Sequence, residues 1–363
     1  MKALIISNPF KGTISSKEIG KTISFILRNR GISSLSIPST DGGDGFLDAF
    51  EYIDKDAIRK TYRLKFLNKE INAEYLINNK LNIAYISLSD TCGIKYLSKE
   101  EYDPMNIGLY PLGLLFRYIL ENENVSLIKI GIGGSPSVDL GAGFLEGLGA
   151  RFYDKSGLEL HNLCNSKLKD IDKVDTSYVD YLIKDVNIVC LQDVNCKILT
   201  NGACDSYALT KGASSSDIPV IKDNAKAFIN LTKKIKGSMV KDGYGFGAAG
   251  GFSFTLFNYL NAMLVSGAEE FLESIKIDEL LKTYDLVITG EGVYDNQTTQ
   301  GKLIKAIMNH NPKNVIIVCA KNITKTKKNI YSIVPSVASE AESMSHPKEC
   351  LMKLIESIDF NNI

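Results

Sequence analysis

The chain has 363 residues, which is long for a single hydrophobic core and favours two domains. Its 44% of hydrophobic and 23% of charged residues are ordinary for a globular protein, and no apolar run is long enough to span a membrane. The 42 basic and 42 acidic residues cancel, which argues against a nucleic-acid-binding protein and against a polybasic membrane patch.

The cysteines and histidines give no sign of a metal site. The seven cysteines have neither CxxC pairs nor metal-ligand spacing, and such a set predicts reduced thiols in a cytoplasmic protein. The three histidines lie far apart in the sequence, so we expect neither a zinc site nor a histidine-based triad. The amino terminus has too short an apolar run for a signal peptide.

The first part of the chain alternates strands and helices. Residues 3–7 and 34–38 read as strands, because each is a short apolar stretch that ends at a turn signal. An N-cap pattern at 15–18 precedes the amphipathic run 19–27, and a second helix is expected near 47–53. This alternation predicts a parallel sheet with its loops on one edge.

The pattern changes after residue 57. Three β-rich runs, 60–66, 71–77 and 81–87, are separated by Asn- and Lys-containing turns and predict an antiparallel meander. A helix is expected at 109–120, followed by a strand at 127–130, a Gly-rich loop and a short helix ending near residue 148.

The rest of the chain returns to the α/β pattern. A strand at 187–192, a helix at 224–236, the Gly-dense stretch 243–251 and a helix at 252–264 are expected first. Strands at 285–289, 315–319 and 330–334 follow, with helices between them. We therefore predict a discontinuous α/β domain, 1–57 plus 265–363, and an inserted α/β domain, 58–264.

Chemistry-bearing residues follow several of these strands, and ligands of open α/β sheets bind at the carboxyl ends of strands. Lys11 follows the first strand, where it suits a phosphate or a carboxylate, although a surface turn explains it equally well. The loop 41–45 places Asp41 beside Gly42 and Gly43 and suits Mg²⁺; a turn with an aspartate capping the next helix is the alternative.

Two Gly-rich loops suit an anion or a nucleotide. Gly133, Gly134 and Ser135 lie in a loop whose successive N–H groups can form an anion-binding concavity, and Asp139 could hold a metal there. The pair Gly250-Gly251 suits a close approach of the backbone to a ligand. Tight packing of a helix on a sheet explains either loop as well.

The strongest local signal is the stretch 289–302. Gly290 and Glu291 end an apolar strand, Asp295 follows, and Lys302 opens a helix at 303–308. Two acids, glycines and a lysine at a helix start suit a phosphate and its metal, whereas a capped helix with a solvated lysine is the alternative. Because all these loops follow strands, they can converge on one site.

At this point the chain resembles the glycerate kinases, a family that phosphorylates D-glycerate with ATP. The matching motifs, in family order, are Phe10-Lys11-Gly12, Asp41-Gly42-Gly43-Asp44-Gly45, Gly131-Ile132-Gly133-Gly134-Ser135, Gly141-Ala142-Gly143, Asp193-Val194, Lys211-Gly212-Ala213, Gly247-Ala248-Ala249-Gly250-Gly251 and Thr289-Gly290-Glu291-Gly292. The resemblance implies two α/β domains, one of them discontinuous, with ATP, Mg²⁺ and glycerate in the cleft between them. The implied enzyme is a phosphotransferase that makes 2-phosphoglycerate.

Residue type and position suggest roles within such a kinase. We assign Lys11, Asp193, Asp295 and Lys302 to catalysis, with the lysines on phosphate or substrate carboxylate. Asp139, Asp193 and Glu291 are the candidate metal ligands, and the sequence leaves open which carboxylate is the base. The predicted substrate and nucleotide contacts are Asp41, Gly42, Gly43, Gly133, Gly134, Ser135, Gly250, Gly251 and Gly290.

Several positions differ from the family pattern. Asn8-Pro9 replaces Asp-Ser, Phe46 replaces a threonine, Val138 an asparagine, Asn195 an aspartate and Val293 an arginine. These differences leave open a kinase for another small hydroxy acid, or a non-catalytic metabolite-binding relative. The expected partners are a small hydroxy acid and a nucleotide, with no nucleic acid or membrane, and a homodimer is left open.

Overall fold

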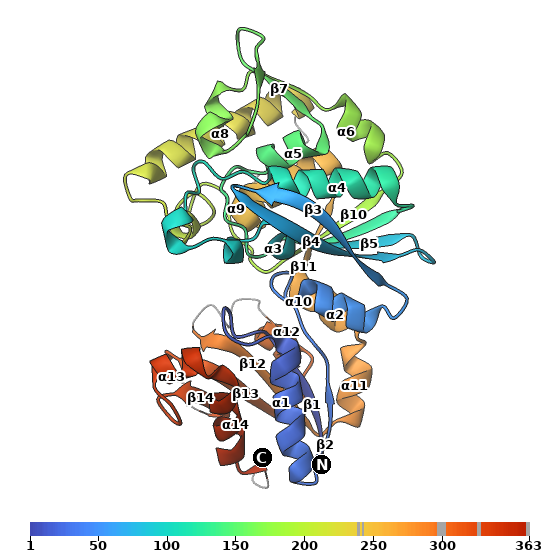
Figure 1. Cartoon of the computed structure of the whole chain (residues 1–363), viewed down its shortest axis with the longest axis vertical. Helices are drawn as coiled ribbons and strands as arrows, with labels where there is room; N and C mark the ends of the chain where they lie inside the picture. The colour runs from blue at the N-terminus through green and yellow to red at the C-terminus, as the bar shows by residue number, and fades with distance from the viewer. Residues whose placement is uncertain (238–239, 242, 296–302, 325–327, 361–363) are drawn as a thin grey trace. The chain divides into compact units, whose positions relative to one another are not determined.

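The computed structural model describes residues 1–237, 240–241, 243–295, 303–324 and 328–360. The chain divides into two compact units, which are considered separately below. The discontinuous unit contains Met1–Lys55 and Ser266–Ile363, and the inserted unit contains Asp56–Val265. Figure 1 shows helices and strands alternating in the first and a strongly twisted sheet covered by helices in the second.

The discontinuous unit is built on a parallel sheet with the strand order β14-β13-β12-β1-β2. Its strands are β1 (Lys2–Ser7), β2 (Ser33–Ser36), β12 (Leu286–Tyr294), β13 (Val315–Asn322) and β14 (Ile330–Val334). Strand β12 pairs with β1 so that Gly290 lies opposite Ser7. The predicted parallel sheet, with its C-terminal strands added to the N-terminal ones, is confirmed.

Helices cover both faces of this sheet. Its helices are α1 (Ser16–Asn29), α2 (Phe46–Ile53), α10 (Gly267–Ser274), α11 (Ile277–Thr283), α12 (Leu303–Asn309), α13 (Glu340–Ser345) and α14 (Pro347–Ser357). Within β1, Ala3 and Ile5 join the core beneath α1 and α14, whereas Leu4 and Ile6 join the core beneath α10 and α12. A strand buried on both faces needs consecutive apolar residues, which is why β1 reads as an unbroken apolar run.

The predicted start of α1 is confirmed. Ser15 is the N-cap residue, and its hydroxyl accepts a hydrogen bond from the Glu18 N–H at 3.2 Å. The Glu18 carboxylate accepts one in return from the Ser15 N–H at 3.3 Å, which completes a capping box.

The inserted unit has a mixed sheet with the strand order β11-β10-β6-β5-β4-β3. Its strands are β3 (Ile58–Phe66), β4 (Lys69–Asn78), β5 (Ile83–Ser87), β6 (Leu127–Gly131), β10 (Asn187–Gln192) and β11 (Met263–Ser266). Strands β3, β4 and β5 form the predicted antiparallel meander, while β5, β6 and β10 are parallel.

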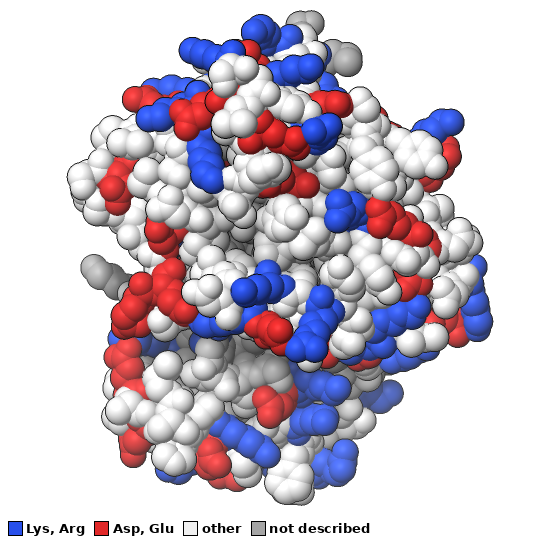
Figure 2. All heavy atoms as spheres, turned by 45° about the horizontal axis from the view of Figure 1, so that its top comes forward, with Lys and Arg blue, Asp and Glu red and all other residues white. Residues whose placement is uncertain are grey.

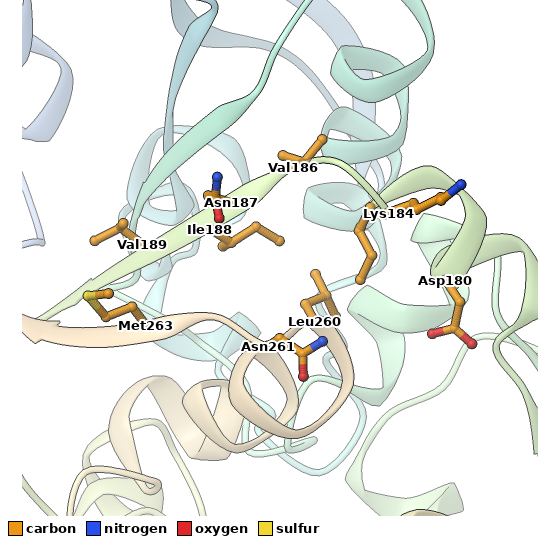
Figure 3. A pocket seen from close by; sticks show the side chains of 10 residues that line it. Asp180, Lys184, Val186, Asn187, Ile188, Val189, Leu260, Asn261 and Met263 are labelled. Carbon is orange, nitrogen blue, oxygen red and sulfur yellow. The ribbon is translucent and has the colours of Figure 1, made fainter.

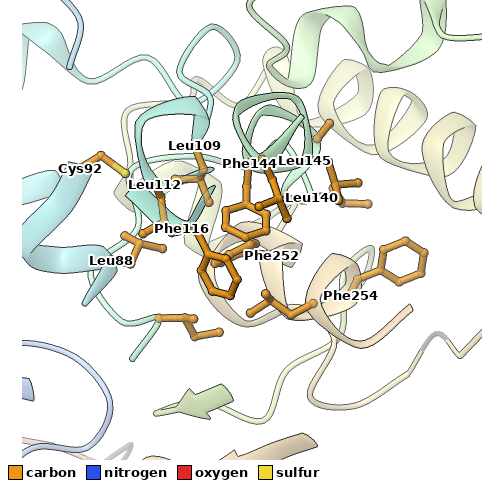
Figure 4. Close-up of a cluster of buried hydrophobic side chains, with 14 of the residues drawn as sticks. Leu88, Cys92, Leu109, Leu112, Phe116, Leu140, Phe144, Leu145, Phe252 and Phe254 are labelled. Carbon is orange, nitrogen blue, oxygen red and sulfur yellow. The ribbon is translucent and has the colours of Figure 1, made fainter. Parts of the chain in front are cut away.

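One large core holds this unit together. Its α-helices are α3 (Leu88–Cys92), α4 (Tyr110–Asn122), α5 (Ala142–Leu148), α6 (Ser177–Leu182), α7 (Ser206–Thr210), α8 (Asp217–Lys236) and α9 (Ala248–Leu260), with 3-10 turns η1 (Ile94–Tyr96), η2 (Lys99–Glu101) and η3 (Asn165–Asp170). Figure 4 shows Phe144 of α5 gathered with Phe116 of α4 and Phe252 of α9. The ring centroids of Phe144 lie 5.3 Å and 4.7 Å from those of these neighbours. The core therefore fixes α5, and with it the loop that precedes α5, against two other helices.

One expectation for this unit is wrong, and one small sheet was not predicted. The helix expected at 252–264 ends at Leu260, because Asn261 adopts a left-handed conformation (φ 55°) and ends it, and Met263–Ser266 form β11. A small antiparallel sheet of β7 (Arg151–Tyr153), β8 (Glu159–Leu160) and β9 (Lys173–Asp175) was not expected. Strands of two or three residues are too short to show a periodic pattern.

Two features of the described residues can be compared with the sequence, the length of the apolar helices and the distribution of charge. Within the described part of the chain, no helix is both long and apolar enough to cross a membrane. Figure 2 shows both acidic and basic side chains on the face in view.

Candidate functional site

The loops that follow β1 and β2 are joined at the carboxyl edge of the discontinuous sheet. The Ser16 hydroxyl donates to the Ser7 carbonyl at 2.6 Å and accepts from the Ser39 N–H at 2.8 Å. Asn8 Nδ2 donates to Asp41 Oδ2 at 2.8 Å. The structure therefore brings together two loops that the sequence had predicted separately.

Asn8, which stands where the family pattern has an aspartate, donates a hydrogen bond that links the first loop to Asp41. We expect Asn8→Asp to destabilise the protein by about 1–3 kcal/mol at pH 7 without divalent cations, because a hydrogen-bond donor becomes a carboxylate facing Asp41. The penalty should shrink as the pH falls towards 4, since protonation removes the repulsion. Urea unfolding at both pH values measures it.

The matched control is Asn8→Ala, which removes the hydrogen bond without adding charge. Asn8→Ala should lower the free energy of unfolding by less than Asn8→Asp does at pH 7. The difference between the two variants should disappear as the pH falls towards 4. Equal costs at pH 7 would contradict a repulsive contact with Asp41.

The remaining predicted residues of these loops are placed as follows. Lys11 is exposed, at the tip of a turn that the Phe10 N–H closes by donating to the Ile14 carbonyl at 3.0 Å. The Gly42 N–H donates to the Thr40 hydroxyl at 3.1 Å. The alternative that an aspartate of this loop is the N-cap residue of α2 is wrong, since the N-cap residue is Gly45 (φ 80°).

The end of β12 lies beside the same loops. The Gly290 carbonyl accepts a hydrogen bond from the Asn8 N–H at 2.9 Å, and a Cβ on Gly290 would lie 2.1 Å from the Val318 carbonyl. Glu291 is only 7% exposed, and Asp295 is half-buried where β12 ends. Lys302 lies outside the described residues, so its predicted role remains a prediction.

In the inserted unit, the β6–α5 turn (residues 132–141) contains the predicted anion-binding loop. Three buried side chains from distant parts of the chain each donate a hydrogen bond to a carbonyl of this turn. Lys211 Nζ donates to Ser137 at 2.6 Å, Asn165 Nδ2 donates to Val138 at 3.0 Å, and the Thr255 hydroxyl donates to Leu140. Because its carbonyls are held from outside, the turn has a fixed shape rather than that of a solvated loop.

Asp139 holds the same turn through its N–H groups. The carboxylate is fully buried and accepts hydrogen bonds from the N–H groups of Gly141 and Gly143, each at 3.0 Å, and of Leu109 at 3.2 Å. Burial raises the pKa of Asp139, and these hydrogen bonds oppose that rise. The geometry gives Asp139 a clear structural use, and its predicted metal contact is untested.

Lys211 is an unusually buried cation. The residue is 8% exposed, and burial lowers its pKa to about 8, while Asp139, the nearby cysteines and Asp193 act in the opposite direction. A buried ammonium is costly unless opposite charge and hydrogen bonds compensate for it. Lys211 is thus a candidate functional residue that sequence reasoning placed in a motif without giving it a role.

The two glycines of the predicted nucleotide loop pack against the same turn. Gly250 and Gly251 adopt left-handed conformations with φ of 72° and 88°. A Cβ on Gly250 would lie 1.9 Å from the Ser137 carbonyl, and one on Gly251 would lie 2.8 Å from Leu140 Cγ. Close packing therefore accounts for both glycines, and their contact with a ligand stays a prediction.

Polar groups also gather where β10 ends. Asp193 follows the strand and is half-buried, and the preceding Gln192 has a buried Oε1 with no hydrogen-bond partner among the described residues. A Cβ on Gly245 would lie 3.1 Å from Gln192 Nε2 and 3.6 Å from Asn195 Oδ1. Two amides thus lie close to Gly245 at the edge of the sheet that carries Asp193.

The positions that differ from the family pattern fall into two groups. Val138 and Phe46 are fully buried in the cores of their units, so their apolar side chains serve packing. Val293 is 46% exposed on β12, and Asn195 is exposed after β10. Of these four positions, Val293 and Asn195 have exposed side chains that a dissolved ligand could reach.

A pocket of about 440 Å³ lies away from these loops, at the amino-terminal end of β10 (Figure 3). Figure 3 shows Leu260 and Asn261 at the end of α9 and Met263 of β11 facing Ile188 of β10, with Asp180 to one side. Ligands of parallel sheets bind at the opposite, carboxyl ends of strands, so we do not assign this pocket to the candidate site.

The described residues contain no group of three or more His, Cys, Asp or Glu side chains placed to share one metal ion. Mg²⁺ is usually held by one or two carboxylates together with water and substrate phosphates. Asp193, directly after β10 of the inserted unit, and Glu291, within β12 of the discontinuous unit, each carry the hard oxygen donors that Mg²⁺ prefers, and the metal contacts of these residues and of Asp139 stay predictions.

Sequence reasoning missed the residues that shape these loops. Asn165 and Thr255 lie in a 3-10 turn and a helix far from residues 132–141 in sequence, and no local signal connects them with the turn. Asn8 was noticed only as a difference from the family pattern. Its position directly after a buried strand was the available signal.

Known proteins resemble the chain over nearly its whole length. It is 31% identical over 312 residues to glycerate 2-kinase of Escherichia coli, covering 85% of this chain and 81% of the relative. It is 28% identical over 378 residues to glycerate kinase of Bacillus subtilis, covering 99% and 97%. A crystal structure assigned to glycerate kinase 2 of Salmonella typhimurium LT2 superposes with a TM-score of 0.75 at 25% identity, covering 98% and 96% of the two chains.

A family model gives the same result. The model of the glycerate kinase family matches residues 3–360, a range that includes every candidate residue named above. The predicted α/β fold and the predicted resemblance are both confirmed. The chain belongs to the glycerate kinase family and is a phosphotransferase of that family.

Proposed function

We propose that this phosphotransferase moves the γ-phosphoryl group of ATP to the 2-hydroxyl of D-glycerate and forms 2-phosphoglycerate. The observation that carries the proposal is the family match over residues 3–360, which includes both the preformed β6–α5 turn and the loops around Asp41. We also propose that the predicted domains, 1–57 plus 265–363 and 58–264, are the functional parts of the enzyme.

The proposed step is a single displacement. The glycerate hydroxyl oxygen bonds to the γ-phosphorus, the bond from that phosphorus to the β,γ-bridging oxygen breaks, and ADP leaves with the bond electrons. Asp193 is the proposed acceptor of the hydroxyl proton, and Asp295 is proposed to orient the hydroxyl. Lys11 and Lys302 are proposed to neutralise charge on the phosphates or on the glycerate carboxylate.

Mg²⁺ is the proposed metal, and Asp193 and Glu291 are the residues proposed to hold it. When bound, Mg²⁺ neutralises charge on the transferred phosphoryl group. Asp41 with Gly42 and Gly43, the turn residues Gly133, Gly134 and Ser135, and the glycines 250, 251 and 290 are proposed to surround the nucleotide and the acid. Gly133 and Gly134 precede the carbonyls held by Lys211, Asn165 and Thr255, so their position is fixed before a ligand binds.

Coupled turnover assays test the reaction and its position. The protein, ATP, Mg²⁺ and D-glycerate should give a product that enolase dehydrates directly, because enolase acts on the 2-phosphate and not on the 3-phosphate. A product that enolase consumes only after a phosphoglycerate mutase is added would overturn the regiochemistry. ADP binding without any turnover would overturn the activity and favour a metabolite-binding relative.

A different small hydroxy acid is the alternative substrate, and two exposed positions favour it. Asn195 and Val293 replace an aspartate and an arginine of the family pattern, and both side chains reach solvent near candidate residues. A loss of charge at a binding site changes which acids it accepts. Measuring kcat/KM for a panel of small hydroxy acids tests this alternative. If D-glycerate gives the highest kcat/KM, the alternative is rejected.

A further inference from the structure

We propose that Asp139 and Lys211 are a pair of buried positioning residues that hold the β6–α5 turn from its two sides, and that Asp139 is not a ligand of the catalytic metal. The identity of the ligand at this turn rests on the proposed function. The geometry of the pair does not.

The surroundings of Asp139 leave little room for a metal. Oδ2 accepts two backbone hydrogen bonds and Oδ1 accepts one, and the side chain is fully buried. Glycine at 143 is required there, because a Cβ at that position would lie 2.9 Å from Oδ2. Mg²⁺ keeps several water molecules and approaches a carboxylate oxygen to about 2.0–2.1 Å, so its binding would displace some of the N–H groups that donate to Asp139.

Lys211 binds a backbone carbonyl of this turn, whereas Asp139 binds backbone N–H groups. Its ammonium group donates to the Ser137 carbonyl at 2.6 Å, two residues before Asp139, so a cation binds a carbonyl and an anion binds N–H groups of one short segment. Besides Asp139, the groups that raise the pKa of Lys211 electrostatically include Cys204, Cys196 and Asp193. Burial first, and then nearby carboxylates, raise the pKa of Cys196 to about 11 and that of Cys204 to about 12, so both thiols are neutral near pH 7.

Charge balance explains why both residues are tolerated. A single buried charge is strongly unfavourable, and removing one member of a buried pair leaves the other uncompensated. Asp139 is among the opposite charges that act on Lys211, and the two side chains bind adjacent parts of the turn, the Ser137 carbonyl and the Gly141 N–H, before any ligand binds. A turn preorganised in this way places its N–H groups without further ordering when a phosphate arrives.

Nucleotide binding without turnover separates positioning from metal ligation. Calorimetric titration with ADP compares the wild type with Asp139→Asn and Lys211→Met, once in EDTA and once with saturating Mg²⁺. We expect both variants to bind ADP at least tenfold more weakly in both conditions. The exposed control Lys184→Met should stay within twofold of the wild type. A loss in Asp139→Asn that occurs only with Mg²⁺ would identify a metal ligand and overturn the proposal.

A double-mutant cycle on unfolding tests the pair independently of any ligand. Asp139→Asn with Lys211→Met should lower the urea midpoint by less than the sum of the single changes, because the double variant leaves no uncompensated buried charge. Additive midpoint shifts would overturn the pairing. If the wild type binds no ADP, the proposed function fails. The unfolding cycle still tests whether Asp139 and Lys211 stabilise one another, because it needs no ligand.

Hydrogen exchange of the wild-type protein covers the case in which a variant does not fold. The amides of Leu109, Gly141 and Gly143 donate to Asp139 and should exchange at least a hundredfold more slowly than that of Ser156 in the exposed β7–β8 connection. Exchange of these amides at the rate of Ser156 would overturn the proposal.

Discussion

Asp193→Asn should lower kcat for D-glycerate by about 100- to 10,000-fold, the range expected when a group that accepts the reacting proton is lost. Asp193 lies directly after β10, between the two side-chain amides near Gly245, those of Gln192 and Asn195. The substitution keeps the size of the side chain, so packing should survive. Initial-rate kinetics at saturating ATP measures the effect.

The dependence on Mg²⁺ then assigns the role of Asp193. If the carboxylate accepts the proton, kcat stays low at every Mg²⁺ concentration. If it holds the metal, high Mg²⁺ restores part of the rate.

The matched control is Asp185→Asn. Asp185 is exposed and lies two residues before β10, at the amino-terminal end of the strand that Asp193 follows. Its kcat should remain within twofold of the wild type. A fall of less than threefold in Asp193→Asn would remove Asp193 from the catalytic residues.

Gly250→Ala should destabilise the protein by about 2–5 kcal/mol. About 1–2 kcal/mol comes from placing a side chain on a left-handed backbone, here at φ 72°. A further amount of about 1–3 kcal/mol comes from overpacking, because the new Cβ would lie 1.9 Å from the Ser137 carbonyl. Urea unfolding measures the free-energy change, and displacement of Ser137 should also weaken ADP binding.

Gly157→Ala separates these two causes. Gly157 has a similar backbone conformation (φ 84°), and a Cβ there would have no atom within 4 Å. The control should therefore cost only about 1–2 kcal/mol. Equal costs for the two variants would show that the approach of Gly250 to the β6–α5 turn is not a tight contact.

The sequence alone was sufficient for elements whose signals are local. The apolar run of β1, the capping box of Ser15 and Glu18, and the alternating strands of the meander each depend on residues close together in the chain. Such elements are determined by periodicity and by backbone hydrogen bonds within a few residues. The same local motifs, in order, were also sufficient to identify the family.

The sequence could name the loops of the candidate site but not the use of each residue in them. The sequence predicted a nucleotide contact for Gly250 and a metal contact for Asp139. In the structure Gly250 packs closely against the Ser137 carbonyl, and Asp139 accepts backbone hydrogen bonds. A glycine needed for a ligand and a glycine needed for a carbonyl look identical in sequence. Only the tertiary structure shows that Gly250 approaches the carbonyl of Ser137, more than a hundred residues away, and its contact with a ligand stays a prediction.

What the sequence by itself determined is therefore the fold class, the order of the elements and the set of strand-end loops, including the stretch around Glu291. The tertiary structure alone decided that Asn8 pairs with Asp41, that Lys211 is buried, and that three distant side chains fix one turn. The physical reason is the sequence separation of the interacting residues. Helices and strands follow from residues close together in the chain, whereas burial and charge compensation depend on groups that only folding brings together.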